Sequence, residues 1–201
     1  MSDLSGRVAS VCVFCGSSNG VDPAFVQGAT DFGQLLAAAK IRLVYGGGGV
    51  GLMGACARAA HEAGGRVLGV MPEFLRKREI LFDEVETIVV RSMHERKSIM
   101  FKESDAFAVL PGGIGTLEEV VELMSWRRLE LHRKPIVFHN PNGFWNPLFE
   151  FIGHTARMGL APPAFLHTWS AAERVEDILP AMEALLSDKG PAAVRLMPEV
   201  S

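Results

Sequence analysis

Residues 106–119 read Ala106-Phe-Ala-Val-Leu-Pro-Gly-Gly-Ile-Gly-Thr-Leu-Glu-Glu119. The apolar beginning is typical of a buried strand, and the proline and glycines that follow favour a tight turn. A helix is expected after the turn, beginning near Leu117. A strand joined to a helix by such a turn is the repeating unit of parallel α/β sheets, so this stretch predicts the fold class.

The same alternation extends in both directions along the chain. Strands are predicted at 8–14, 43–45, 67–71, 87–90, 106–110, 136–138 and 165–169. Their continuous apolar character is that of strands covered on both faces. We therefore expect an α/β fold, Rossmann-like and doubly wound, with a mainly parallel sheet and helices on both faces. We expect a single domain over 1–187 and a flexible tail over 188–201.

Composition narrows the classes of function. The 201 residues carry 20 basic and 23 acidic side chains, and this balance argues against a nucleic-acid or membrane-surface partner. The three cysteines favour a reducing compartment. Cys12 and Cys15 belong to a predicted strand and point to opposite faces of it, so they are not expected to form a redox pair. Without a signal or membrane-spanning pattern, the expected location is the cytoplasm.

Four turns that follow predicted strands have unusual chemistry. They are Gly16-Ser-Ser-Asn-Gly20, Gly46-Gly-Gly-Gly-Val-Gly51, Ser92-Met-His-Glu-Arg-Lys97 and Pro111-Gly-Gly-Ile-Gly-Thr116. Right-handed crossovers bring the carboxyl ends of parallel strands to one edge, where ligands of open α/β sheets bind. The four turns are therefore expected to form one crevice.

The turn from Pro111 to Thr116 favours an anion. Its glycines let backbone N–H groups approach a ligand closely, and the start of the helix adds its positive dipole end. A phosphate fits this chemistry, although the turn lacks the lysine of a nucleoside-triphosphate P-loop. The alternative is a structural turn in which Thr116 is only the helix N-cap.

Glu119 has two interpretations. Thr116-x-x-Glu119 matches a capping box, in which the glutamate binds a backbone N–H, and Glu118 would be a first-turn partner of the helix dipole. Alternatively, the Glu119 carboxylate reaches a bound sugar, where it orients water or accepts a proton. We favour the second interpretation because the other turns converge on this helix.

Two cations occupy the first turn of a helix that Ser92 is expected to cap. Arg96 and Lys97 oppose the helix dipole there, typically by about 0.3–1 kcal/mol each, so an anionic group should compensate them. Arg96 shares a helical stripe with Met93 and Met100 and is expected to face inward. The alternative for Arg96 is a purely structural ion pair.

Three further features have less specific interpretations. Gly46–Gly54 contains a G-x-G-x-x-G pattern, which suggests a dinucleotide-dependent oxidoreductase or simply close backbone approach. His94 has no second histidine or cysteine at metal-ligand spacing, so we expect an exposed helix residue and no metal. Trp126 is a candidate for one wall of a base pocket, with core packing as the alternative.

Three motifs taken together resemble the LONELY GUY family of cytokinin-activating phosphoribohydrolases, which also carries the older label lysine decarboxylase-like. They are Gly46-Gly-Gly-x-x-Gly-Leu-Met-Gly54, Met93-His-Glu-Arg-Lys97 and Pro111-Gly-Gly-x-Gly-Thr-x-x-Glu119. The resemblance extends from about residue 8 to residue 186. The decarboxylase label itself is not supported, because no lysine stands in a recognisable Schiff-base context.

The resemblance implies hydrolysis of an N6-substituted adenosine 5'-monophosphate, or of AMP, to the free base and ribose 5-phosphate without a metal or organic cofactor. It implies Arg96 and Glu119 as the catalytic pair and a homodimer with its sites near the subunit interface. The implied phosphate cradle is Gly112, Gly113, Gly115 and Thr116. Further nucleotide contacts are expected from Gly47, Gly48, Met93, Lys97 and Ser17.

One segment departs from the family pattern. Arg127-Arg128-Leu129-Glu130-Leu131 stands where relatives more often have a small or uncharged pair and a glycine. The departure leaves the catalytic pair in place but bears on the base pocket. The alternative function is a non-catalytic nucleotide-binding carrier on the same fold, which would need the phosphate turn but not the pair of Arg96 and Glu119.

Overall fold

The computed structural model describes residues 8–76 and 82–187, so the predicted tail at 188–201 lies outside the described residues. Seven strands form one sheet in the order β4-β3-β2-β1-β5-β6-β7, and each neighbouring pair in this sheet is parallel. The strands are β1 (Ser10–Phe14), β2 (Arg42–Tyr45), β3 (Val67–Pro72), β4 (Glu86–Val90), β5 (Ala106–Val109), β6 (Ile136–His139) and β7 (Ser170–Ala172).

Helices connect these strands. They are α1 (Pro23–Ala38), α2 (Gly51–Glu62), α3 (Glu73–Arg76), α4 (Met93–Lys102), α5 (Ile114–Arg128), α6 (Asn146–Arg157) and α7 (Ile178–Leu186). Short 3-10 helices lie at Pro141–Gly143, Pro163–His167 and Val175–Asp177.

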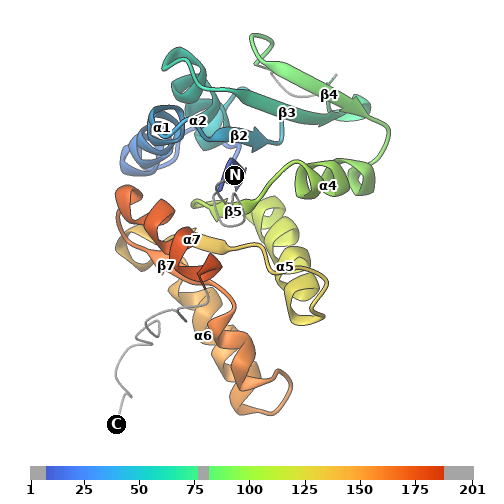
Figure 1. Cartoon of the computed structure of the whole chain (residues 1–201), viewed down its shortest axis with the longest axis vertical. Helices are drawn as coiled ribbons and strands as arrows, with labels where there is room; N and C mark the ends of the chain where they lie inside the picture. Colours follow the sequence, from blue (N-terminus) through green and yellow to red (C-terminus); the bar gives the residue numbers. More distant parts are fainter. Residues whose placement is uncertain (1–7, 77–81, 188–201) are drawn as a thin grey trace, which may run out of the picture.

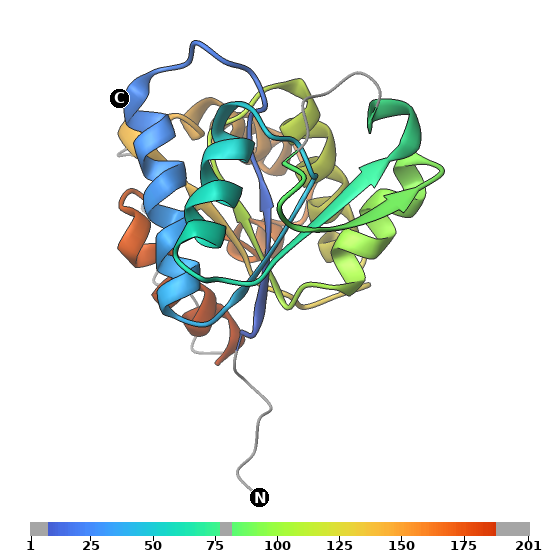
Figure 2. The ribbon, with the colours of Figure 1, turned by 90° about the horizontal axis from the view of Figure 1, so that it is seen from above.

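The helices cover both faces of the sheet. In Figure 1 and Figure 2, α1 and α2 lie on one side of the strands, and α4 and α5 lie on the other. The side chains of β1 alternate accordingly: Val11 and Val13 belong to the core under α1 and α2, whereas Cys12 and Phe14 belong to the core under α4 and α5. The predicted doubly wound α/β fold is confirmed.

The predicted seventh strand at 165–169 is wrong. Residues Pro163–His167 form a 3-10 helix, and the strand follows it at Ser170–Ala172. Proline at the start of the segment suits a helical turn, and the rings of Phe165 and Trp169 then pack together at a centroid distance of 5.1 Å. The true strand is short and made of small residues, so it lacks the β-branched signal on which the prediction depended.

The order of the strands positions the predicted turns. β1 lies between β2 and β5, so the turns after these three strands are neighbours at the carboxyl edge. The N–H of Gly16, after β1, donates to the carbonyl of Pro111, after β5, at 3.0 Å. The N–H of Met53, in α2, donates to the carbonyl of Gly16 at 3.1 Å. The predicted convergence is confirmed for the turns after β1, β2 and β5.

Candidate active site

The start of α5 differs from the prediction. The helix begins at Ile114 with Gly113 as its N-cap, and Thr116 lies inside the first turn and is buried. Gly113 has φ −99° and ψ −151°, an extended conformation from which the helix starts without a side-chain cap. Thr116 is therefore not the N-cap, and the capping-box interpretation of Glu119 is wrong. Gly115 lies within this first turn, although glycine has a low helix propensity.

This helix start is open to an anion. Gly113 and Gly115 are exposed, and a methyl group at either position would meet no atom within 4 Å. The first turn contains no acidic side chain, and its N–H groups have no helical acceptor. Gly112 is different, because a methyl group there would lie 2.2 Å from Thr116 Oγ1. The threonine side chain thus packs over the glycine and beside the free N–H groups.

Arg96 is held at the carboxyl ends of two strands. Ser92 caps α4 by accepting from the N–H of Glu95 at 3.1 Å, as expected. From the first turn of this helix, Arg96 extends inward and is only 7% exposed. Its Nε donates to the carbonyl of Val70 at 3.1 Å, and its Nη2 donates to the carbonyl of Gly46 at 3.3 Å. Backbone atoms of β3 and of the turn after β2 therefore fix the guanidinium.

The remaining side of the guanidinium meets Glu119. Arg96 Nη1 lies 3.5 Å from Glu119 Oε1, and Glu119 is 8% exposed. The predicted approach of the two side chains is confirmed, as is the presence of an anionic group that compensates the cations of α4. A carboxylate paired with an arginine favours its ionised form. The catalytic role of the pair stays a prediction.

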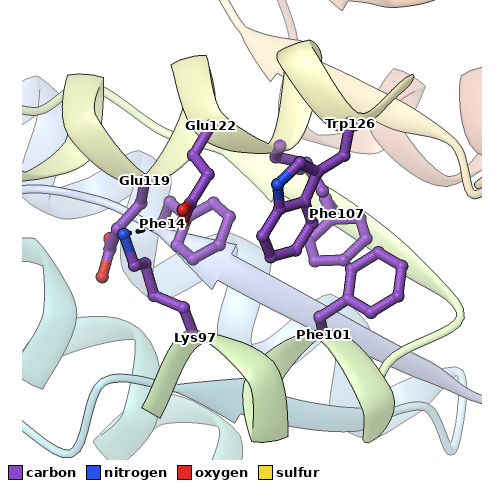
Figure 3. A pocket seen from close by; sticks show the side chains of 8 residues that line it. Phe14, Lys97, Phe101, Phe107, Glu119, Glu122 and Trp126 are labelled. Atoms are coloured by element: carbon purple, nitrogen blue, oxygen red, sulfur yellow. Dashed lines mark ion pairs between the residues drawn. The ribbon is translucent and has the colours of Figure 1, made fainter. Parts of the chain in front are cut away.

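Lys97 also pairs with α5. Its Nζ lies 2.5 Å from Glu118 Oε1 and 2.7 Å from Glu122 Oε2, and these hydrogen bonds raise the pKa of the lysine against the opposing effect of burial. Figure 3 shows the lysine extending from α4 toward the carboxylates of α5. The nucleotide contact predicted for Lys97 stays a prediction.

A pocket lies beneath these ion pairs, between α4 and α5. Its volume is about 10 Å³, room for about one water molecule and far less than a purine base needs. Trp126 packs edge-on against Phe101 at 5.4 Å between ring centroids (Figure 3). Its role as the wall of a base pocket stays a prediction. The lining residues are Phe14, Lys97, Phe101, Phe107, Glu119, Glu122, Leu123 and Trp126.

The other predicted contacts lie around the same edge. Met93 Sδ is 3.9 Å from Arg96 Nη1, and Ser17 is exposed in the turn after β1. Gly47 and Gly48 are buried in the turn after β2, where Gly47 has a left-handed φ of 83° that favours glycine. The structure brings these residues to the carboxyl edge of the sheet, and their contacts with a nucleotide stay predictions.

The G-x-G-x-x-G pattern has a steric explanation. A methyl group would lie 2.0 Å from Arg96 Nη2 at Gly46, 2.6 Å from the carbonyl carbon of Ser17 at Gly51, and 2.2 Å from the carbonyl oxygen of Gly49 at Gly54. Each glycine is therefore required by packing within the protein. The pattern by itself does not call for a dinucleotide.

Two structural residues were missed in the sequence. Glu122 stands one helical turn after Glu118 and Glu119, and this acidic stripe opposite Lys97 was the signal that could have revealed it. Lys134 donates to the carbonyls of Phe101 and Ser104 at 2.6 and 2.7 Å, at the end of α4, and burial lowers its pKa. An ammonium group at a helix C-terminus is favourable.

Other predictions concern single side chains. His94 is exposed, as expected. Cys12 and Cys15 belong to cores on opposite faces of the sheet, and burial raises the pKa of both thiols.

Across 8–76 and 82–187, no three His, Cys, Asp or Glu side chains are arranged to hold a metal ion. None of the helices described has the length and apolar character needed to span a membrane.

Comparison with known proteins identifies the family. A family model described as "Possible lysine decarboxylase" matches residues 53–182. The chain is 42% identical over 185 residues to cytokinin riboside 5'-monophosphate phosphoribohydrolase LOG5 of Arabidopsis thaliana, covering 92% of this chain and 81% of that protein. The chain belongs to the family of cytokinin riboside 5'-monophosphate phosphoribohydrolases. It is also 43% identical over 178 residues to the probable phosphoribohydrolase LOGL9 of Oryza sativa subsp. japonica, covering 88% of this chain and 78% of the relative.

Solved structures share the fold of this phosphoribohydrolase family member. The molybdenum cofactor carrier protein of Chlamydomonas reinhardtii aligns with a TM-score of 0.67 at 22% identity, over 90% of this chain and 99% of the carrier. DNA processing protein A of Streptococcus pneumoniae aligns with a TM-score of 0.54 at 13% identity, over 86% and 61% of the two chains. At these identities the likeness is one of fold alone.

Proposed function

We propose that this protein hydrolyses the N-glycosidic bond of a nucleoside 5'-monophosphate and releases the free base and ribose 5-phosphate. The observation that carries the proposal is a buried pair of Arg96 and Glu119 beside an open, uncapped helix start at the carboxyl edge of the sheet. Membership of a phosphoribohydrolase family supports it. We assign the activity to one domain over 1–187.

The open start of α5 supplies the phosphate site. The N–H groups of Gly113, Gly115 and Thr116 are free of helical acceptors, and a phosphate would also meet the positive end of the helix dipole. Glu119 follows one turn later on the same helix. The ribose of a bound nucleotide therefore extends from the phosphate toward this carboxylate.

The carboxylate suits cleavage at C1'. The bond from C1' to the base nitrogen breaks as positive charge develops on the ribosyl ring, and an ionised Glu119 stabilises that charge. Glu119 takes a proton from water, the water oxygen bonds to C1', and the base leaves with its bonding electrons and takes up the proton that Glu119 then releases. Glycoside hydrolysis provides a parallel for this use of a carboxylate. Arg96 keeps Glu119 ionised and fixed in position.

The proposed substrates are N6-substituted adenosine 5'-monophosphates or AMP, without a metal or organic cofactor. The protein is proposed to act as a cytoplasmic homodimer. Several apolar side chains along α5 and just beyond it are exposed, which supports association through this helix. They are Ile114, Val121, Leu129 and Leu131. The solution mass at micromolar concentration tests the dimer.

The test of function uses Glu119→Gln. The wild-type protein should release free base from at least one member of a panel of nucleoside monophosphates, measured by chromatography. The variant should lose roughly 10²–10⁴-fold in kcat, because glutamine retains the size of the side chain but cannot accept a proton or offset positive charge. Its thermal midpoint should fall, since Arg96 then lacks its buried counter-charge.

Glu150→Gln is the matched control, because Glu150 is an exposed glutamate on α6, a helix that carries neither Arg96 nor Glu119. It should leave both kcat and the thermal midpoint unchanged. If Glu119→Gln keeps wild-type kcat, the assignment of Glu119 is wrong. If the wild-type protein binds AMP but releases no base from any nucleotide, the protein is a carrier and not a hydrolase.

A further inference from the structure

Three carboxylates gather on one side of α5. Glu118 and Glu119 are adjacent in this helix, and Glu122 follows them by about one helical turn. Glu119 and Glu122 both line the pocket between α4 and α5. Like charges at this spacing on a helix repel one another. Left uncompensated, Glu118 and Glu122 would favour the protonated form of Glu119.

Lys97 stands at the point where it offsets this repulsion. Its Nζ lies 2.7 Å from Glu122 Oε2 and is also paired with Glu118, and the lysine side chain is only 14% exposed. Figure 3 shows the ammonium group between the two helices, on the Glu119 side of the pocket. A single cation is thus bound to both carboxylates that flank Glu119.

The other groups around Glu119 do not replace this cation. The guanidinium of Arg96 is shared between Glu119 and the carbonyls of Gly46 and Val70. Burial raises the pKa of the nearby thiols, so they remain neutral. The titratable and charged groups that face Glu119 from the packed elements are Arg96 and Lys97 on α4, Glu118 and Glu122 on α5, and Cys12 on β1. Cys15, just after β1, belongs to the core on the opposite face of the sheet and interacts with Glu119 only electrostatically.

We propose that Lys97 is a positioning residue that keeps Glu119 ionised by neutralising Glu118 and Glu122 and by fastening α4 to α5. The effect on turnover rests on the proposed function. The effect on the ionisation of Glu119 does not, because it follows from the arrangement of charges in the protein alone. Lys97 acts through the carboxylates of α5 and need not touch the substrate.

The variant Lys97→Met removes the cation and keeps much of the stem of the side chain. The pKa of Glu119, followed by ¹³C NMR of its carboxyl group in the full chain and assigned with Glu119→Gln, should rise by about one unit. The acid limb of the pH profile of kcat should move upward by the same amount. At a pH well below both pKa values kcat should be about tenfold lower than in the wild type, and well above the shifted pKa it should equal the wild-type value.

Two companion variants separate charge from structure. The triple variant Lys97→Met with Glu118→Gln and Glu122→Gln removes the cation and both anions, and should restore the pKa of Glu119 and the acid limb to near wild type. Lys97→Arg keeps the charge and should leave the pKa of Glu119 near its wild-type value. If Lys97→Met does not fold, Glu118→Gln with Glu122→Gln in the presence of Lys97 should lower the pKa of Glu119 below its wild-type value.

Several results would overturn the proposal. One is an unchanged pKa of Glu119 in Lys97→Met, or an unchanged pKa in the double variant if Lys97→Met does not fold. Another is a triple variant in which the pKa of Glu119 stays as high as in Lys97→Met. A rise in KM alone, not restored in the triple variant, would show that Lys97 binds the substrate instead. If the wild-type protein hydrolyses no nucleotide, the proposed function fails, yet the NMR titration still decides the role of Lys97.

Discussion

The turn after β2 is packed against neighbouring atoms, whereas the turn after β5 faces open space at its helix start. Methyl groups at Gly46 and Gly54 would lie 2.0 and 2.2 Å from other atoms of the protein. At Gly113 and Gly115 they would meet nothing within 4 Å. Neither of these two has a left-handed φ that requires glycine.

This difference separates glycines required by the fold from glycines available to a ligand. In the turn after β2, glycine makes room for Arg96 and for the backbone around α2. In the turn after β5, no packing contact and no left-handed φ requires glycine at position 113 or 115, and Gly115 lowers the intrinsic stability of the first helical turn. The phosphate site that we propose at this helix start would account for both, because glycine lets an anion approach the backbone closely. Substitution of a glycine in the turn after β2 should therefore disturb packing, whereas substitution in the turn after β5 should mainly disturb binding.

Gly46→Ala should have the largest effect. Its methyl group must displace the Arg96 guanidinium, which then loses its position against Glu119. We expect kcat to fall about 100-fold, the usual scale for a misplacement of about 1 Å. The free energy of unfolding should fall by about 1–3 kcal/mol through overpacking. Steady-state kinetics and denaturant unfolding measure the two effects, and a fully active variant would contradict the packing explanation.

Gly113→Asp should separate stability from binding. An aspartate at the N-cap should stabilise α5 by about 0.5–1 kcal/mol, because its carboxylate accepts from the free N–H groups. The same carboxylate occupies and repels the phosphate site, so KM should rise at least about tenfold, or by about 1.4 kcal/mol in binding. Kinetics and thermal unfolding of one preparation measure both effects.

Gly113→Asn is the isosteric control for charge. Asparagine caps a helix about as well as aspartate, so the gain in stability should be similar. The rise in KM should be smaller because asparagine adds no negative charge. Equal values of KM for the two variants would mean that no anion binds at this helix start.

The sequence was sufficient for the fold class and for the main contact of the site. The strand-turn-helix alternation predicted a parallel sheet, and the stripe of Arg96 with Met100 predicted an inward-facing arginine that meets an anion. The beginning of α5 was misplaced because the low helix propensity of Gly115 argued against a helix before Thr116. β7 was misplaced because Ser170–Ala172 has no apolar periodicity.

Contacts between elements that are distant in the chain could not be predicted from the sequence. The hydrogen bonds from Arg96 to the carbonyls of Gly46 and Val70 join segments that are separated by 50 and 26 residues. Such bonds depend on how α4 packs on the ends of β2 and β3, and no local pattern encodes that packing. The pairing of Lys97 with two carboxylates of α5 is of the same kind.

Gly115→Ala is the smallest and most discriminating change. Gly115 lies within the first turn of α5, where alanine is a better helix former by about 0.8–1 kcal/mol, and its methyl group meets no protein atom within 4 Å. The thermal midpoint should therefore rise by about 2–4 °C. If glycine is present so that a phosphate can approach the backbone, the methyl group should raise KM by about threefold, or roughly 0.6 kcal/mol, and leave kcat unchanged. Gly54→Ala has the same chemistry in α2 but should lower the midpoint, because its methyl group would meet the carbonyl oxygen of Gly49 at 2.2 Å. A stabilised Gly115→Ala with unchanged KM would place the phosphate elsewhere. The turn after β5 would then be exposed for a reason other than ligand binding.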